Sequence, residues 1–287
     1  MFSYDTLVEN LFKTNAIEIC PKDKPFWYTS NKIGPYYINT DYLYGSKEKS
    51  EALLKVINQL SDDKANISSI ILDLTLSNYE TDETYRFLID SMIEFTRREI
   101  GNYDFISGGE RRDWFFSLIL AHFLKKPHIT LFKDLSTVVF LPQTVTEDIN
   151  SVDNLKVLHI ADIINEASSY ERAWVPAIEA FGAKITDSLV VIDRLQGGSE
   201  KLSSLDVNSH SLAKVEVELF EMALKKNLID EAQFIMVENY IADPYNSMRS
   251  FLIDNPIFLE NSLNSDTKTS QRTKACIEQD LYKLKEN

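Results

Sequence analysis

The chain has 287 residues, of which 44% are hydrophobic, and it carries a formal net charge of −14 at pH 7. This length suits one large α/β domain or two small ones, and the apolar fraction is ample for a globular core. A duplex nucleic-acid binder needs a concentrated basic face, and the sequence contains no Lys/Arg-rich block. The composition therefore argues against a nucleic-acid partner.

Membrane attachment and secretion are not expected either. The N-terminal stretch MFSYDTLVENLF contains two acidic residues and lacks a basic region, so it does not resemble a signal peptide. The longest apolar run, WFFSLILAHFL, is too short to span a bilayer. Cys20 and Cys276 lie far apart and form no metal-ligand spacing, which favours two reduced thiols in a cytoplasmic protein without a protein-built metal site.

Taken in chain order, the first 45 residues are aromatic and are expected to be irregular. Apolar periodicity predicts helices over 46–60 and 81–100, and the run at 114–124 is apolar on all sides, as in a buried helix. Short apolar runs predict strands at 68–74, 103–107, 128–132 and 137–141.

The second half begins with a polar connector over 142–154, which shows no periodicity. A buried strand at 155–162, a helix at 169–182 that is closed by Gly182, and a strand at 184–194 follow. From Ser209 onward the pattern is almost wholly helical. Strands that alternate with helices predict an α/β fold, with a mainly parallel, doubly wound sheet of five or six strands.

Three predicted strands end in polar segments: SGGERRD, ADIINEASS and DRLQGG. The carboxyl ends of parallel strands share one edge of the sheet, where ligands bind. In SGGERRD, Gly108 and Gly109 would form a tight turn, and Arg111 and Arg112 could bind a phosphate or a pyrophosphate. The alternative is an ordinary Gly-Gly turn with solvated arginines.

The ADIINEASS segment has the layout of a phosphate-binding strand–loop–helix turn, in which Ser168 and Ser169 supply hydroxyls. Simple helix capping explains the same serines equally well. Glu166 would repel a phosphate, and Ala167 would be strained if it adopted a left-handed conformation. At the third strand end, Arg194 could contact a ligand or form a buried pair with Asp193.

These segments resemble the type I phosphoribosyltransferases, and among them the orotate phosphoribosyltransferases. The resemblance runs from about residue 11 to residue 202 and depends on four segments in the family's order. FWYTSNKIGPYYIN resembles the segment that forms part of a hood over the base, and SGGERRDWFF stands at the pyrophosphate loop. VLHIADIINEASS stands at the diphosphate-sugar signature V-x-x-x-D-D-V-I-T-T-G-T-S, and VVIDRLQGG resembles the segment whose arginine helps to hold orotate.

The resemblance implies roles for individual residues. Asp162 and Lys133 would serve catalysis. The phosphate or pyrophosphate would be bound by Gly108, Gly109, Arg111, Arg112, Asn165, Ser168 and Ser169. The base would be bound by Thr29, Tyr36, Tyr37 and Arg194.

The chain departs from the family pattern at the positions that carry the chemistry. Ala161 stands where the first acid of the signature is expected, and Glu166 and Ala167 replace the T-G of T-T-G-T-S. Thr29 replaces a frequent lysine, Arg111 and Arg112 replace a Tyr-Lys pair, and Asp113 replaces a glycine. The mobile loop normally reads R-K-x-x-K-x-H-G, and here FKDLSTVVFLPQ keeps only Lys133.

Two functions remain open at this point. One is an enzyme that transfers phosphoribose to a pyrimidine base, with orotate as the first expectation and Mg²⁺ held through the substrate's phosphates. The other is a binding or regulatory protein that kept the fold and takes a phosphosugar or nucleotide without turnover. The resemblance also implies a homodimer. It implies an α/β domain over 1–208 that includes a hood (1–45). The helical pattern from Ser209 predicts a helical extension over 209–287 packed on that domain.

Overall fold

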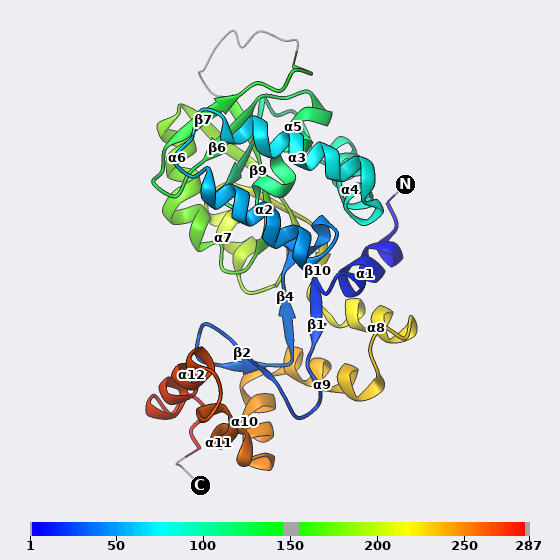
Figure 1. The fold of residues 1–287 in the computed structure, drawn as a ribbon, viewed down its shortest axis with the longest axis vertical. Coiled ribbons are helices and arrows are strands. Elements are labelled where there is room, and N and C mark those ends of the chain that lie inside the picture. Colours follow the sequence, from blue (N-terminus) through cyan, green and yellow to red (C-terminus); the bar gives the residue numbers. More distant parts are fainter. Residues whose placement is uncertain (1, 146–154, 285–287) are drawn as a thin grey trace. The chain divides into compact units, whose positions relative to one another are not determined.

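The computed structural model describes residues 2–145 and 155–284, so most of the predicted connector at 142–154 lies outside the described residues. The contacts divide the chain into two compact units (Figure 1). The first unit contains Met1–Thr14 and Thr40–Val215, and the second contains Asn15–Asn39 and Glu216–Asn287. None of the helices in the described ranges is both long enough and apolar enough to cross a membrane.

A six-stranded sheet forms the centre of the first unit, in the order β10-β9-β8-β5-β6-β7. All neighbouring strands are parallel except β6 and β7, which confirms the predicted mainly parallel α/β sheet. The strands are β5 (Phe105–Gly109), β6 (His128–Leu131), β7 (Thr137–Phe140), β8 (Leu155–Ile164), β9 (Ala183–Asp193) and β10 (Asn208–Lys214).

Helices cover both faces of this sheet, as a doubly wound fold requires (Figure 1). One face is covered by α5, with α3 and α4 outside it, and the other by η2, α6 and α7. The helical elements of the unit are α1 (Tyr4–Lys13), η1 (Thr40–Tyr44), α2 (Lys47–Gln59), α3 (Ile67–Thr81), α4 (Glu83–Glu99), α5 (Trp114–Leu124), η2 (Tyr170–Trp174), α6 (Val175–Ala180) and α7 (Gly198–Ser204).

Three of the predicted elements are wrong. The apolar run at 68–74 is part of α3, whose buried residues recur at helical spacing, because short apolar runs do not separate a strand from a buried helix. The N-terminal region, expected to be irregular, contains α1, whose cap Ser3 accepts from the Thr6 amide at 3.3 Å. The region from Ser209 was expected to be helical, but β10 occupies its start. Only Leu212 and Ala213 of this edge strand are buried, so its sequence shows little strand pattern.

The helix α5 is buried, as its sequence predicted, and its residues Trp114 to Ala121 are almost completely shielded from solvent. The apolar run therefore fills the core of its own unit. It does not offer the exposed apolar surface that would argue for a two-fold interface, so the homodimer stays a prediction.

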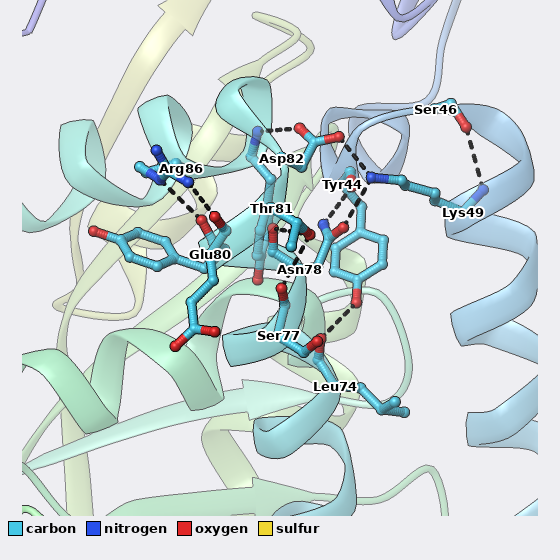
Figure 2. Close-up of polar contacts among 12 residues, drawn as sticks. Tyr44, Ser46, Lys49, Leu74, Ser77, Asn78, Glu80, Thr81, Asp82 and Arg86 are labelled. Carbon is cyan, nitrogen blue, oxygen red and sulfur yellow. Dashed lines mark hydrogen bonds and ion pairs between the residues drawn. The ribbon is translucent and has the colours of Figure 1, made fainter.

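A network of polar contacts ties η1, α2, α3 and α4 together (Figure 2). Asp82 caps α4, and its Oδ2 also accepts from the Lys49 ammonium of α2 at 2.8 Å. The Asn78 side chain accepts from Lys49 at 3.1 Å and donates to the Tyr44 carbonyl at 2.6 Å, while the Tyr44 hydroxyl donates to the Leu74 carbonyl at 3.1 Å. These contacts fix the end of η1, the element that carries two residues of the site described below.

The second unit combines two antiparallel strand pairs with a group of helices from the C-terminal part of the chain. β1 pairs with β4, and β2 pairs with β3. The elements are β1 (Ile17–Ile19), β2 (Phe26–Trp27), β3 (Ile33–Gly34), β4 (Tyr36–Ile38), α8 (Val217–Lys225), α9 (Glu231–Ala242), α10 (Pro244–Asp254), α11 (Ile257–Leu263) and α12 (Thr267–Glu278).

Hydrogen bonds over long sequence distances join the two segments of this unit. The Trp27 indole donates to the Ser262 hydroxyl at 3.1 Å, and the Ile33 amide donates to the Tyr282 hydroxyl at 3.0 Å. The Arg272 guanidinium donates to the Trp27 carbonyl at 2.8 Å. Residues 15–39 thus fold with the C-terminal helices, whereas the sequence-based division grouped them with 1–208.

Candidate ligand-binding site

A cavity of about 330 Å³ lies in the first unit, at the carboxyl ends of β5 and β8. One wall is the segment 110–113 that follows β5, and the other is the end of β8 with the loop 165–169. The lining is completed by Lys133, which follows β6, and by Tyr170 and Trp174 of η2. Seven of the predicted site residues line this cavity: Arg111, Arg112, Lys133, Asp162, Asn165, Ser168 and Ser169.

Gly108 and Gly109 do not form the predicted turn, and they are absent from the lining. Both are buried as the last residues of β5, and the Gly109 amide already donates to Asp113 Oδ2 at 2.9 Å. A Cβ on Gly108 would lie 2.2 Å from Ser117 Oγ, and one on Gly109 would lie 2.3 Å from Trp174 Cζ2. These positions require glycine because helix side chains pack directly against the strand backbone.

The three cations of the cavity differ in how they are held. Arg111 donates to the Asn58 side chain, and Arg112 donates through Nε to Asp41 Oδ1 at 3.0 Å. Lys133 is exposed, and within the described parts of the chain its ammonium has no hydrogen-bonding partner. Three cationic side chains thus meet at this end of the cavity, and one of them, Arg112, is paired with the buried carboxylate of Asp41.

Asp162 lies at the end of β8, surrounded by other carboxylates. Its Oδ2 accepts from the Thr40 hydroxyl at 3.2 Å, and its own amide donates to Asp113 Oδ1 at 3.2 Å. Burial, followed by repulsion from Asp113, raises the pKa of Asp162 from 3.8 to about 7, while Arg112 opposes the rise and Asp41 adds to it. The Asp162 carboxylate is therefore partly protonated near neutral pH.

Asp113 precedes α5 and joins the two walls of the cavity, because it accepts from the amides of both Gly109 and Asp162. The buried His159 places Nε2 3.6 Å from Asp113 Oδ2, and its Nδ1 lies 2.9 Å from the Ser107 hydroxyl. His159 also packs against the rings of Tyr170 and Trp174. Asp113 therefore connects the cavity to a buried polar pair formed by Ser107 and His159.

The loop 165–169 contains one residue in the left-handed region of φ. Ala167 has a φ of 53°, the left-handed region in which an L-residue is strained by roughly 1–2 kcal/mol and glycine is not. Glu166, Ser168 and Ser169 are exposed at the cavity. Arg172 supports the loop by donating to the Ser168 carbonyl at 3.1 Å.

Arg194, predicted to contact the base, follows β9 and lies outside the lining. Its Nη1 is 3.5 Å from Asn165 Oδ1, and its amide donates to the Ile164 carbonyl at 3.0 Å, so it braces the start of the loop. The three other predicted base contacts belong to the second unit. Tyr36 is buried there between Phe220 and Tyr240, which makes it a core residue, whereas Thr29 is exposed and Tyr37 is partly exposed.

The sequence interpretation missed four residues that shape the site: Thr40, Asp41, Asp113 and His159. Thr40 and Asp41 follow the aromatic segment, and Asp113 was noted only as a replacement for glycine. A polar residue just before or inside an apolar run, such as His159 in VLHIAD, was the available signal. This signal could not show which residues would pair with each other, because partners such as Asp41 and Arg112 are 71 positions apart in the sequence.

The elevated pKa of Asp162 predicts a specific pH dependence of stability. Between about pH 4 and pH 7 the folded state retains a proton that the unfolded state releases, so the free energy of unfolding falls as the pH rises through this window. We expect Asp162→Asn to abolish this loss. The unfolding free energy of the variant, relative to that of the wild type, should then rise by about 1–3 kcal/mol from pH 4 to pH 8, since a tenfold change in proton affinity is worth about 1.4 kcal/mol.

Urea denaturation at several pH values measures this effect. Asp206→Asn is the matched control, because the Asp206 side chain is 84% exposed. An equal pH dependence in the wild type and Asp162→Asn would show that Asp162 titrates normally.

Comparison with known proteins supports the same fold and the same resemblance. No family model matches the chain. An orotate phosphoribosyltransferase of Saccharolobus solfataricus is 31% identical over 90 residues, which cover 31% of this chain and 45% of the relative. One of Staphylothermus marinus is 26% identical over 213 residues, which cover 74% of this chain and 84% of the relative. In the first comparison the match thus spans less than half of the relative's length.

Two solved structures share the fold at low sequence identity. The UMP synthase of Leishmania donovani superposes with a TM-score of 0.55 at 13% identity, covering 84% of this chain and 42% of that one. The orotate phosphoribosyltransferase of Francisella tularensis superposes with a TM-score of 0.50 at 17% identity, covering 81% of this chain and 96% of that one. The chain therefore has the fold of the type I phosphoribosyltransferases, and its sequence resembles the orotate phosphoribosyltransferases among them.

Proposed function

We propose that the first unit binds a phosphoribosyl sugar or a nucleotide in the cavity at the strand ends. The observation that carries this proposal is the meeting, in one cavity of about 330 Å³, of three cationic side chains with the hydroxyl-bearing loop 165–169 and the carboxylate of Asp162. A cavity of this size falls in the range of small-molecule sites. The similarity to orotate phosphoribosyltransferases supports the same ligand class.

Each side of the cavity suits one part of such a ligand. A 5-phosphate accepts hydrogen bonds, and the loop 165–169 offers donors on the side chains of Asn165, Ser168 and Ser169. Asp162, in its ionised form, can accept hydrogen bonds from ribose hydroxyls. Lys133 and Arg111 face the end where a further anionic group would lie, and charge-assisted hydrogen bonds to such a group are the strong ones.

The finer proposal is phosphoribosyl transfer to a pyrimidine base, with orotate as the first candidate. Mg²⁺ would be bound through the ligand's phosphate oxygens, because this ion is commonly held by substrate phosphates with few protein ligands. The ion would neutralise charge on the departing diphosphate. The contribution of Thr29 and Tyr37 to a base pocket, the homodimer and the cytoplasmic location also belong to this proposal.

The alternative to transfer is binding without efficient turnover, and two observations favour this alternative. Ala161, which lines the cavity, supplies no carboxylate next to Asp162. Between Lys133 and Lys156 the sequence contains no lysine, arginine or histidine that could neutralise a leaving diphosphate. We therefore place ligand binding first and transfer second.

Isothermal titration calorimetry with uridine 5′-monophosphate tests the binding proposal. We expect Ser168→Ala combined with Ser169→Ala to weaken binding by about tenfold or more, because a hydrogen bond to a charged group contributes about 1.5–3 kcal/mol. Ser61→Ala, an exposed serine of the same unit, is the control and should leave the affinity unchanged. Equal affinities of the wild type and the double variant would place the phosphate elsewhere.

A further inference from the structure

The neighbouring strands β5 and β8 stop pairing before either of them ends. Their pairing ends with Ser107 opposite His159, although β5 continues to Gly109 and β8 to Ile164. On its other side β5 pairs with β6, and β8 pairs with β9. The chain therefore leaves these two strands toward opposite halves of the sheet, and a doubly wound sheet binds its ligands at such a point.

The Asp113 side chain bridges the two strands where their pairing has ended. Its Oδ2 accepts from the Gly109 amide of β5 at 2.9 Å, and its Oδ1 accepts from the Asp162 amide of β8 at 3.2 Å. Its main chain is fixed as well, because the Asp113 carbonyl accepts from the Ser117 amide of α5 at 2.9 Å. Asp113 thus fixes the position of Asp162 relative to β5, which the glycine of the family pattern could not do.

These contacts place two carboxyl groups beside each other at the cavity. An ionised carboxylate only accepts hydrogen bonds, which suits the two amides that donate to Asp113. His159 adds a third nitrogen on this side: its buried Nε2 lies 3.6 Å from Asp113 Oδ2 and has no hydrogen-bonding partner in the described chain. Asp162 is the carboxyl of the pair to which the proposed function assigns the hydroxyls of the ligand.

The negative charge of Asp113 makes Asp162 harder to ionise. Burial is the first cause that raises the pKa of Asp162 to about 7, and repulsion from Asp113 is the second. In the described ranges, titratable and charged side chains face Asp162 from several elements: Asp41 of η1, Arg112 and Asp113 before α5, and Tyr170 of η2, with His159 behind Asp113. Glu110, Arg111, Lys133 and Glu166 line the rest of the cavity. Asp162 therefore changes its charge near neutral pH.

We propose that Asp113 is a positioning residue that acts through Asp162: it fixes the Asp162 carboxyl between β5 and β8, and it makes the binding of ligand hydroxyls to that carboxyl stronger as the pH rises. The inference rests on the proposed function and adds a residue and a pH dependence to it. An ionised carboxylate accepts charge-assisted hydrogen bonds, which are stronger than those to a protonated carboxyl group.

Uridine 5′-monophosphate and its 2′,3′-dideoxy form are matched probes, because they differ only in the two ribose hydroxyls. Their phosphates titrate alike, so the ratio of the two affinities reports the hydroxyl contacts. Isothermal titration calorimetry without added Mg²⁺ measures this ratio. In the wild type we expect it to rise about tenfold from about pH 5.5 to pH 8.5, because a hydrogen bond to a charged group exceeds one to a neutral group by about that factor.

Two variants test the role of Asp113 itself. Asp113→Asn removes the charge and keeps an acceptor, so the rise of the ratio should move to lower pH. Asp113→Gly removes the bridge as well, so it should show the same shift and, at about pH 8.5, a ratio that is lower by about threefold or more. Since glycine requires no hydrogen-bonding partners, this variant also carries the test if Asp113→Asn does not fold. Asp206→Asn removes a charge at a side chain that is 84% exposed and should keep the wild-type profile.

The results separate this inference from the proposed function. If the ratio in the wild type does not change with pH, or if the variants keep the wild-type profile, the role of Asp113 is overturned while ligand binding stands. A loss of affinity that is equal for both probes at every pH would show that Asp113 is structural only, and it overturns the inference too. If uridine 5′-monophosphate binds none of the proteins, the proposed function is rejected and the inference with it.

Discussion

Transfer of phosphoribose to orotate is expected to proceed at about 10⁻³ s⁻¹ or more slowly in the wild-type protein. Ordinary enzymes turn over at about 10 s⁻¹, and the loss of one preorganised charge-stabilising group costs about 10²–10³ in rate. Two such groups are missing here. Ala161 leaves Asp162 as the carboxylate of the signature, and no cationic side chain occurs in the sequence between Lys133 and Lys156.

Glu166 adds a third obstacle, because it places a negative charge beside the site proposed for the 5-phosphate. Ala167, at a φ of 53°, holds the loop where glycine would do so without strain. Glu166→Thr combined with Ala167→Gly should therefore tighten binding of the 5-phosphate without restoring the missing charges.

Orotate consumption with phosphoribosyl pyrophosphate and Mg²⁺ measures the turnover of both proteins. The double variant should bind uridine 5′-monophosphate more tightly than the wild type and remain slow in transfer. Wild-type turnover in the range of about 1–10³ s⁻¹ would contradict the prediction. Residues such as Lys133 or Arg111 would then have to stabilise the charge of the leaving diphosphate in the transition state.

Replacing Gly109 with alanine should destabilise the protein by about 1–3 kcal/mol or more, the usual cost of overpacking a core. The added Cβ would lie 2.3 Å from Trp174 Cζ2 and 2.9 Å from Asp113 Oδ2. Neither neighbour can move freely, because Trp174 is 7% exposed within the core and Asp113 is held by two backbone amides. The substitution would also deform the cavity, which Trp174 and Asp113 line.

Gly101→Ala is the matched control, because a Cβ at Gly101 meets no atom within 4 Å. Urea denaturation should show a loss of unfolding free energy for Gly109→Ala and almost none for Gly101→Ala. Equal stabilities of the two variants would mean that β5 can shift away from Trp174, and that glycine is not needed for packing at the strand end.

The sequence alone predicted the parallel sheet and the end of it that bears the site. Most of the buried strands are continuous apolar runs, and parallel strands direct their carboxyl ends to one edge, so Arg112 and Asp162 had to approach each other. The sequence raised a left-handed Ala167 only as a condition, because the family signature that the segment resembles has glycine at this position; the structure shows a φ of 53° there.

What the sequence determined is local: the apolar runs of β8 and α5 and the polar strand ends that follow β5 and β8 all depend on residues close in the chain. The tertiary structure alone decided that Asp41 cancels Arg112, that Gly109 makes room for Trp174, and that Trp27 joins Ser262. These pairs are separated by 65 to 235 positions, and no periodic pattern records such distances. The charge balance of the site follows from them, because a buried ion pair takes its partner from whichever element the fold brings into contact.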